Sequence, residues 1–248
     1  MHPSLKVVEH RRWDLPQGPW AMAQNWEDLL FAHWPVPMEA MRALVPRGLN
    51  LDTFEGQAWI GIVPFRMSGV RLRGLPPMPG LSAFPELNVR TYVKSGGKPG
   101  VWFFSLDAAN RLAVEIARAW FHLPYFQARM ALEAHGQEII YFSRRTDRRG
   151  RSERLEASYA CEGVKFRAQP GTLDYFLTER YCLYAQRRNG TILRGEIHHA
   201  PWELQRARAK ISVNTMTENV GVSLAGKPLL HFSKLQQVIV WQPQEVAL

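Results

Sequence analysis

One short run of alternating side chains has the residue types needed for acid–base or binding chemistry. Residues 86–93 are rich in the types that favour a β-strand. Successive side chains of a strand point to opposite faces, so Glu86, Asn88, Arg90 and Tyr92 share one face. Together they can bind a polar ligand, and the carboxylate can act as a general acid or base. The same pattern is also compatible with a solvent-exposed face or with a structural pair between Glu86 and Arg90.

Other common chemistries lack their residues in this chain. His198 and His199 are neighbours in a predicted strand, so they point to opposite faces, and neither cysteine lies near them at a zinc-ligand spacing. There is no Gly-x-Ser-x-Gly elbow, no glycine-rich phosphate loop and no dinucleotide-binding fingerprint. We therefore predict that the protein uses no metal and no cofactor.

Several runs of the chain resemble, in the same order, the YqjF-like proteins, a bacterial family of unknown function within the acetoacetate-decarboxylase-like superfamily. The runs are residues 31–37, 59–67, 84–93, 101–107 and 177–184. The resemblance extends from about Asn25 to Val240. It implies a cone-shaped antiparallel β-barrel that holds its site inside.

The segment around Tyr125 resembles the part of the decarboxylases in which a Gly-Tyr-Pro turn precedes two adjacent lysines. In that family the first lysine forms an imine with the substrate, and the second lowers the pKa of the first. Here Tyr125 and Phe126 follow Pro124, and neither side chain can form an imine. A fold can persist when its reaction is lost, so we predict that this protein is not an imine-forming decarboxylase. Lys165 is the only lysine that we consider as a relocated nucleophile.

The resemblance also suggests which side chains surround the site. It places Glu86 on a strand that lines the decarboxylase site, and it leaves His33 in the stretch where the family has a carboxylate-binding arginine. His33 can carry a proton near neutral pH or can be a buried structural residue. Tyr125 can donate its hydroxyl to a ligand carbonyl, and Phe126 would line or support the cavity. Three arginines are candidates to replace the missing cation: Arg90, Arg129 and Arg180.

Length and composition favour one domain over residues 1–248. The chain is 46% hydrophobic and shows no linker, internal repeat or low-complexity tract. No secretory signal is recognisable, and no segment approaches the roughly 20 apolar residues that span a bilayer. Its only cysteines, Cys161 and Cys182, are consistent with a reducing compartment. We therefore predict a cytoplasmic protein with no membrane partner, and the sequence is compatible with a homo-oligomer.

The net charge of +9 is concentrated in one arginine-rich run. Its members are Arg144, Arg145, Arg148, Arg149, Arg151 and Arg154. The run lies between two predicted strands and is either a solvated hairpin tip or a patch that binds anions or nucleic acid. It contains no aromatic residue on which a base can stack. We predict no specific nucleic-acid partner.

The chain is predicted to be mainly β. Short strand-like runs bounded by Gly, Pro or Asn occur at residues 58–65, 86–93, 101–106, 138–144, 155–161, 181–187, 191–198 and 238–241. Asn189 and Gly190 predict a type I′ turn, and hence an antiparallel hairpin over residues 181–198. Helices are predicted at 37–44, at 110–121 with Asp107 or Asn110 as the cap, and at 172–178. This pattern predicts a single antiparallel, closed or cone-shaped β-barrel with two or three short helices.

These observations lead to three hypotheses. The first is non-covalent binding of a small organic carbonyl or carboxylate compound in a barrel cavity near Glu86, Arg90 and Tyr125. The second is an acid–base enzyme, such as a lyase, hydratase or isomerase, that uses Glu86. The third is anion or nucleic-acid binding through the arginine hairpin at residues 144–154.

Overall fold

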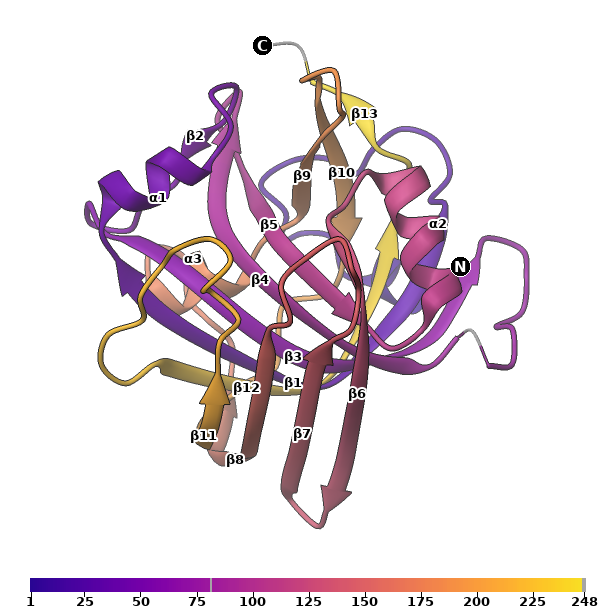
Figure 1. Cartoon of the computed structure of the whole chain (residues 1–248). Coiled ribbons are helices and arrows are strands. Elements are labelled where there is room, and N and C mark those ends of the chain that lie inside the picture. Colours follow the sequence, from indigo (N-terminus) through magenta and orange to yellow (C-terminus); the bar gives the residue numbers. More distant parts are fainter. Residues whose placement is uncertain (81, 247–248) are drawn as a thin grey trace.

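The computed structural model describes residues 1–80 and 82–246 and is dominated by β-strands (Figure 1). The strands are β1 (Met22–Val36), β2 (Asn50–Leu51), β3 (Ala58–Leu72), β4 (Phe84–Ser95), β5 (Lys98–Ala108), β6 (Tyr125–His135), β7 (Glu138–Arg145), β8 (Arg154–Phe166), β9 (Cys182–Gln186), β10 (Ile192–His198), β11 (Leu204–Asn214), β12 (Leu229–Val240) and β13 (Gln244–Glu245). The helices are η1 (Pro3–Lys6), α1 (Met38–Leu44), α2 (Arg111–Phe121) and α3 (Leu173–Thr178). In the described part of the chain, no helix has the length and apolarity needed to cross a membrane.

All the named strands belong to one sheet with an unusual set of pairings. The order is β13-β10-β9-β5-β6-β7-β8-β11-β12-β1-β3-β4-β2, and β4 also pairs with β5. The pairings therefore lead from β5 through β6 to β4 and back to β5. A further pairing joins β10 to β12, so β9 and β10 make a second connection between β5 and β12.

The sequence predicts an antiparallel sheet, but two of the strand pairings in the structure are parallel. Strand β5 pairs in parallel with β6 and with β9. Helix α2 lies in the connection from β5 to β6. It provides the crossover of a dozen or more residues that two parallel neighbouring strands need. The mainly-β prediction is confirmed, with two parallel pairings as a correction.

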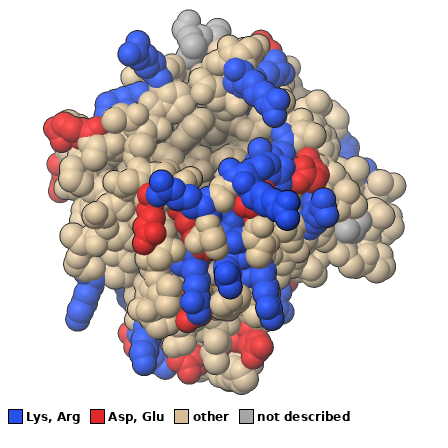
Figure 2. All heavy atoms as spheres, viewed as in Figure 1, with Lys and Arg blue, Asp and Glu red and all other residues tan. Residues whose placement is uncertain are grey.

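One face of the molecule is hollowed and strongly basic. Figure 2 shows a hollow in this face with Lys and Arg side chains gathered along one side of it. A cleft of about 730 Å³ lies between β5, β9 and α2, and its lining includes Arg118, Arg149 and Arg188. Only Arg149 of these three comes from the arginine-rich run.

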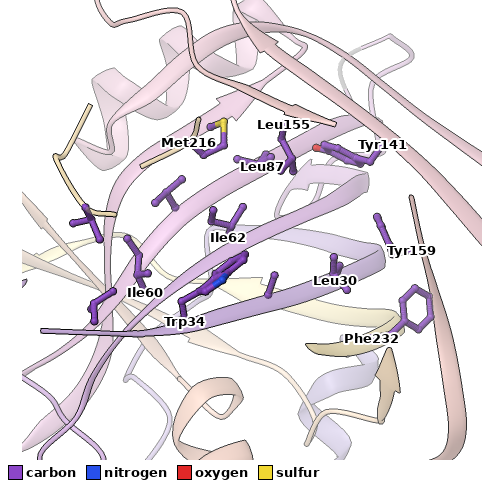
Figure 3. Packing of buried hydrophobic residues seen from close by; sticks show 14 of the residues in the cluster. Leu30, Trp34, Ile60, Ile62, Leu87, Tyr141, Leu155, Tyr159, Met216 and Phe232 are labelled. Carbon is purple, nitrogen blue, oxygen red and sulfur yellow. The ribbon is translucent and has the colours of Figure 1, made fainter. Parts of the chain in front are cut away.

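Strands β1, β3 and β4 are buried on both faces. Leu87 and Ile62 belong to a core cluster that includes Tyr141, Leu155 and Met216 (Figure 3). The alternate residues of β4 point to the other side of the sheet, where the cavity described below lies. A strand enclosed in this way places one set of side chains in an apolar core and offers the other set to a site.

Most of the predicted elements are present, but some strands were missed. The three predicted helices match α1, α2 and α3 within one residue at each end, and Asn110, not Asp107, caps α2 by accepting from the amide of Ala113. Of the longer strands, β1, β6 and β11 were not predicted, and neither were the two-residue strands β2 and β13. In β11 the exposed positions are taken by Arg206, Arg208 and Lys210, which weakens the β-branched and aromatic signal. Strand β1 also contains an irregularity in its pairing near Asp28, whose φ is 51°.

The predicted hairpin forms, but its turn differs from the predicted type. Strands β9 and β10 pair antiparallel around Asn189 and Gly190. Gly190 has a φ of 91°, whereas Asn189 is not among the residues with positive φ. A type I′ turn requires positive φ at both central positions, so that part of the prediction is wrong. The side chain of Asn189 instead accepts a hydrogen bond from the amide of Thr191 at 3.1 Å.

Candidate functional site

A cavity of about 310 Å³ lies where β3, β4, β5 and α2 face one another. Of the four β4 residues that the strand periodicity places on one face, Glu86, Asn88 and Arg90 line it, whereas Tyr92 does not. Aromatic side chains make up much of the remaining wall. They are Trp26, Phe65, Phe84, Phe103, Trp120, Phe121 and Trp202. The site is therefore a largely apolar chamber with a few polar groups on one strand, the usual form of a small-molecule site.

Glu86 is the acidic group of the cavity. Its side chain is 2% exposed, and the hydroxyl of Tyr125 donates to its Oε2 atom at 2.9 Å. Burial, with a smaller contribution from the nearby Asp107, raises the pKa of Glu86 to about 8, against the hydrogen bond from Tyr125, which lowers it. At neutral pH the protonated carboxyl group therefore predominates and can donate a hydrogen bond.

Arg90 is the cationic group of the cavity. The residue is 9% exposed, and its Nη2 atom donates to the carbonyl of Leu177 at 3.3 Å. Its guanidinium carbon lies 5.2 Å from the ring centre of Phe31, and its Nε atom is buried without a hydrogen-bond partner in the described structure. Within residues 1–80 and 82–246, no carboxylate forms an ion pair with Arg90. Glu86 and Arg90 thus share a face without forming the structural pair that the sequence also allowed.

Arg180 also lines the cavity, but its charge is already matched. Its Nη1 atom lies 2.6 Å from the Oδ2 atom of Asp52, and its guanidinium stacks over the rings of Tyr92 and Phe176. The structure therefore gives Arg90 and Arg180 different roles. Arg180 ties α3 to the sheet, whereas Arg90 has hydrogen-bonding capacity to spare.

His33 lies behind the cavity wall. It is fully buried, and its Nε2 atom is 2.6 Å from the hydroxyl of Tyr92, which in turn donates to the carbonyl of Leu177. Burial, and then the positive charge of Arg90, hold the pKa of His33 well below 6.5. A Cβ atom on Gly61 would lie 2.9 Å from the His33 ring, so glycine is needed beside it. This placement fits the structural alternative for His33, not a proton carrier in contact with a ligand.

Two more sequence expectations do not match the placement of the residues. Arg129 is exposed on β6, opposite Arg144, and does not line the cavity. Phe126 was expected to line or support the cavity, but it follows Tyr125 in strand β6 and therefore points to the other face. There its ring lies 4.3 Å from the guanidinium carbon of Arg145. Only Tyr125 of the two residues that stand in place of the lysines reaches the cavity.

Some residues of the cavity were missed by the sequence reasoning. His199 and Trp202 line it from the irregular segment after β10, where no periodic pattern marks them, and Thr178 lines it from the last position of α3. Burial lowers the pKa of His199 to about 4, so its ring is neutral at pH 7. The Nε1 atom of Trp202 is buried without a partner in the described structure. Trp26 lies on β1 and would have been found had that strand been predicted.

No lysine of the described chain lines the cavity. Lys165, the one relocated nucleophile considered above, is exposed, and its Nζ atom lies 3.1 Å from Glu203. The cavity therefore offers a carboxyl, a guanidinium, an amide and a phenol for non-covalent chemistry.

The arginine-rich run is more deeply involved in the fold than a solvated hairpin tip. The side chain of Arg145 is fully buried and bridges Asp107 and Glu153, at 2.8 Å and 2.6 Å. Arg149 pairs with Asp147 and Glu115. Arg154 pairs with Glu156. Half of the six arginines are thus already neutralised by carboxylates, which weakens the case for a polyanion site.

Solved structures with this fold define its class. The acetoacetate decarboxylase of Legionella pneumophila aligns with a TM-score of 0.63 at 12% identity, over 97% of this chain and 92% of that one. The enduracididine biosynthesis enzyme MppR, solved in complex with pyruvate, aligns with a TM-score of 0.64 at 11% identity, over 96% and 93%. An acetoacetate decarboxylase-like enzyme of Sphingomonas wittichii RW1 aligns with a TM-score of 0.63 at 9% identity, over 93% of this chain and 94% of that one. The fold is therefore acetoacetate-decarboxylase-like.

The chain belongs to the DUF2071 family, described as an uncharacterized conserved protein, whose sequence profile matches residues 23–237. It is 50% identical to the uncharacterized protein YqjF of Bacillus subtilis (strain 168). The alignment of 234 residues covers 94% of this chain and 96% of that protein. The resemblance noted in the sequence is thereby confirmed.

Proposed function

We propose that this protein binds a small organic carboxylate in the cavity without forming a covalent bond to it. The observation that carries the proposal is the buried guanidinium of Arg90, which lines the cavity and has no carboxylate partner in the described structure. Removing such an ion from water costs several kcal/mol unless another charge or hydrogen bonds compensate. A ligand carboxylate offers both, in a geometry that a guanidinium fork matches.

Glu86 complements Arg90 as a neutral donor. Because burial raises its pKa to about 8, its carboxyl group can donate to a carbonyl or carboxyl oxygen of the ligand. The hydroxyl of Tyr125 holds that carboxyl group in place. A carboxylate can bind Arg90 and accept a hydrogen bond from Glu86 at the same time, and the complex of the structural neighbour MppR with pyruvate, a carboxylic acid, agrees with this class.

The proposal includes an enclosed site. We take the strands as a closed, cone-shaped barrel around the cavity. The return of the pairings from β4 to β5 and the second connection through β9 and β10 support this interpretation. The cytoplasmic location, the single domain and a homo-oligomer stay predictions from the sequence.

A second candidate function is acid–base catalysis by Glu86. It is favoured by the pKa of about 8, because a general acid or base works best when its pKa lies near the working pH. The neighbouring Tyr125 would orient the carboxyl group towards the reacting atom. Turnover of a bound oxo acid, lost in Glu86→Gln while binding persists, would distinguish catalysis from binding alone.

The test of binding compares two arginines. Calorimetry with oxo acids and monocarboxylates of two to eight carbons should show binding to the wild-type protein and to Arg129→Gln, whose side chain is exposed outside the cavity. Arg90→Gln should bind roughly 10- to 150-fold more weakly, because a hydrogen bond to a charged group contributes about 1.5–3 kcal/mol. Thermal unfolding checks that both variants fold. Equal binding by Arg90→Gln, or no binding of any acid to the wild type, would contradict the proposal.

A further inference from the structure

We infer that the bound carboxylate carries an aliphatic tail, as a medium-chain fatty acid does, with its head at Arg90 and its tail at the mouth of the cavity. The inference rests on the proposed function and specifies the class of ligand. Its basis is a set of exposed apolar side chains around the opening between α2 and the loop that joins β3 to β4.

Five large apolar side chains that line the cavity are 43–59% exposed. They are Leu72, Leu75, Met78, Leu112 and Ile116. Single exposed apolar side chains are ordinary on protein surfaces, but a cluster of them around an opening marks an interaction site. Figure 1 shows α2 and the loop between β3 and β4 on the same side of the molecule.

Helix α2 presents its apolar stripe to the cavity. Leu112, Ile116 and Trp120 follow one another at four-residue spacing and all line the cavity, as do Ala113 and Ala117. In a helix packed tightly on a sheet such a stripe is covered. Here Leu112 and Ile116 stay about half exposed, so an apolar ligand would complete their burial.

The walls between the mouth and Arg90 are also apolar. Phe84, Phe65 and Phe103 come from β4, β3 and β5 and face the same space. The volume of about 310 Å³ lies at the lower end of the roughly 300–1,000 Å³ of small-molecule sites. An acid of two or three carbons leaves much of that volume empty, whereas octanoate, with ten non-hydrogen atoms, fills it.

The experiment is a chain-length series. Straight-chain acids from acetate to dodecanoate, kept below their micelle concentrations, are titrated calorimetrically into the protein. Affinity should rise about fourfold for each added methylene, the factor that corresponds to about 0.8 kcal/mol of apolar burial. The rise should level off near eight carbons, where the enclosed volume is filled and further carbons leave through the mouth.

Matched variants locate the tail and the head. Ile116→Ser should weaken octanoate binding several-fold and leave butanoate binding unchanged. Ile140→Ser is the control, because Ile140 is 46% exposed on β7 and does not line the cavity. Arg90→Gln should weaken the binding of octanoate and of butanoate alike. Arg71→Gln, at the rim of the cavity, should weaken the binding of neither acid.

The outcomes separate this inference from the proposed function. If short acids bind through Arg90 but affinity does not grow with chain length, the binding function stands and the aliphatic tail is refuted. If octanoate depends on Arg71 instead of Arg90, the head lies at the mouth and the orientation is refuted. If Ile140→Ser matches the effect of Ile116→Ser, the mouth has no special role. If no acid binds, both proposals fail together.

Discussion

Replacing Glu86 with glutamine should stabilise the protein at alkaline pH and change its stability little at acidic pH. The reason is that the cavity holds the carboxyl group against ionisation. The pKa of Glu86 is raised from 4.5 to about 8, first by burial and then by the charge of Asp107. Above pH 8 the folded protein must therefore keep an unfavourable buried carboxylate, which glutamine removes while keeping the shape of the side chain.

The sign and size follow from proton linkage. Between pH 4.5 and about 8 the folded state keeps a proton on Glu86 that the unfolded chain has released. The free energy of unfolding of the wild type therefore falls as the pH rises through this window. A pKa displaced from 4.5 to about 8, at about 1.4 kcal/mol for each pH unit, corresponds to at most about 5 kcal/mol.

Another buried carboxyl group titrates in the same range. Burial raises the pKa of Asp107 from 3.8 to about 7, against the opposing charge of Arg145. Asp107 is present in both proteins, so it contributes to the pH dependence of each and largely cancels in their difference. The difference in unfolding free energy between Glu86→Gln and the wild type is therefore the quantity to measure.

Urea unfolding between pH 4.5 and pH 9 provides that difference. We expect the difference in unfolding free energy to be smallest near pH 4.5 and to grow steadily with pH. Above about pH 8 it should level off, with the glutamine variant the more stable protein. A difference that is constant across the range, or that grows towards acidic pH, would show that Glu86 ionises normally in the folded protein. The account of the cavity as an environment that favours the neutral carboxyl group would then be wrong.

Other predictions concern the neighbours of this site. Arg145→Ala should lower the unfolding free energy in urea by about 3–5 kcal/mol, because it leaves two buried carboxylates without their shared cation; Arg148→Ala, in the same run but exposed, should change it by less than about 0.5 kcal/mol. Tyr125→Phe should lower the unfolding free energy by about 1 kcal/mol. It should also raise the pKa of Glu86 further, since the lost hydrogen bond favours the ionised form. Carboxyl NMR titration measures that pKa, and an unchanged or lower value would contradict the prediction. Borohydride with a β-keto acid should leave no reduced adduct detectable by mass spectrometry, and an adduct on any lysine would disprove the absence of imine chemistry. DNA or RNA should bind feebly, without sequence preference, and be released by roughly 0.2 M salt; tight, sequence-dependent binding at that salt would restore the nucleic-acid hypothesis.

Local periodicity was enough to assemble the polar face of β4. Alternation placed Glu86, Asn88 and Arg90 on one side because successive side chains of any strand point to opposite faces. Helical spacing and the stop at Pro124 likewise located α2. The loss of imine chemistry at this segment followed from side-chain identity alone, because neither a phenol nor a phenyl ring can form an imine. These conclusions depend on residues that are near neighbours in the chain.

The partner of each charged group was decided only by the tertiary structure. Arg90 and Arg180 are alike in the sequence, yet Asp52, 128 residues before Arg180, neutralises only the latter. Arg145 looked like one of six surface arginines until β5 and β7 brought it beside Asp107.

Glu86 shows where the sequence stops and the fold takes over. The sequence determined which face of β4 carries the carboxyl group, whereas the fold determined its chemistry, by burying it and bringing Tyr125, 39 residues away, to its Oε2 atom. A pKa depends on desolvation and on nearby charges, and both are properties of how distant segments pack. For that reason the candidate site could be located from the sequence, but its protonation, its free cation and its apolar mouth could not.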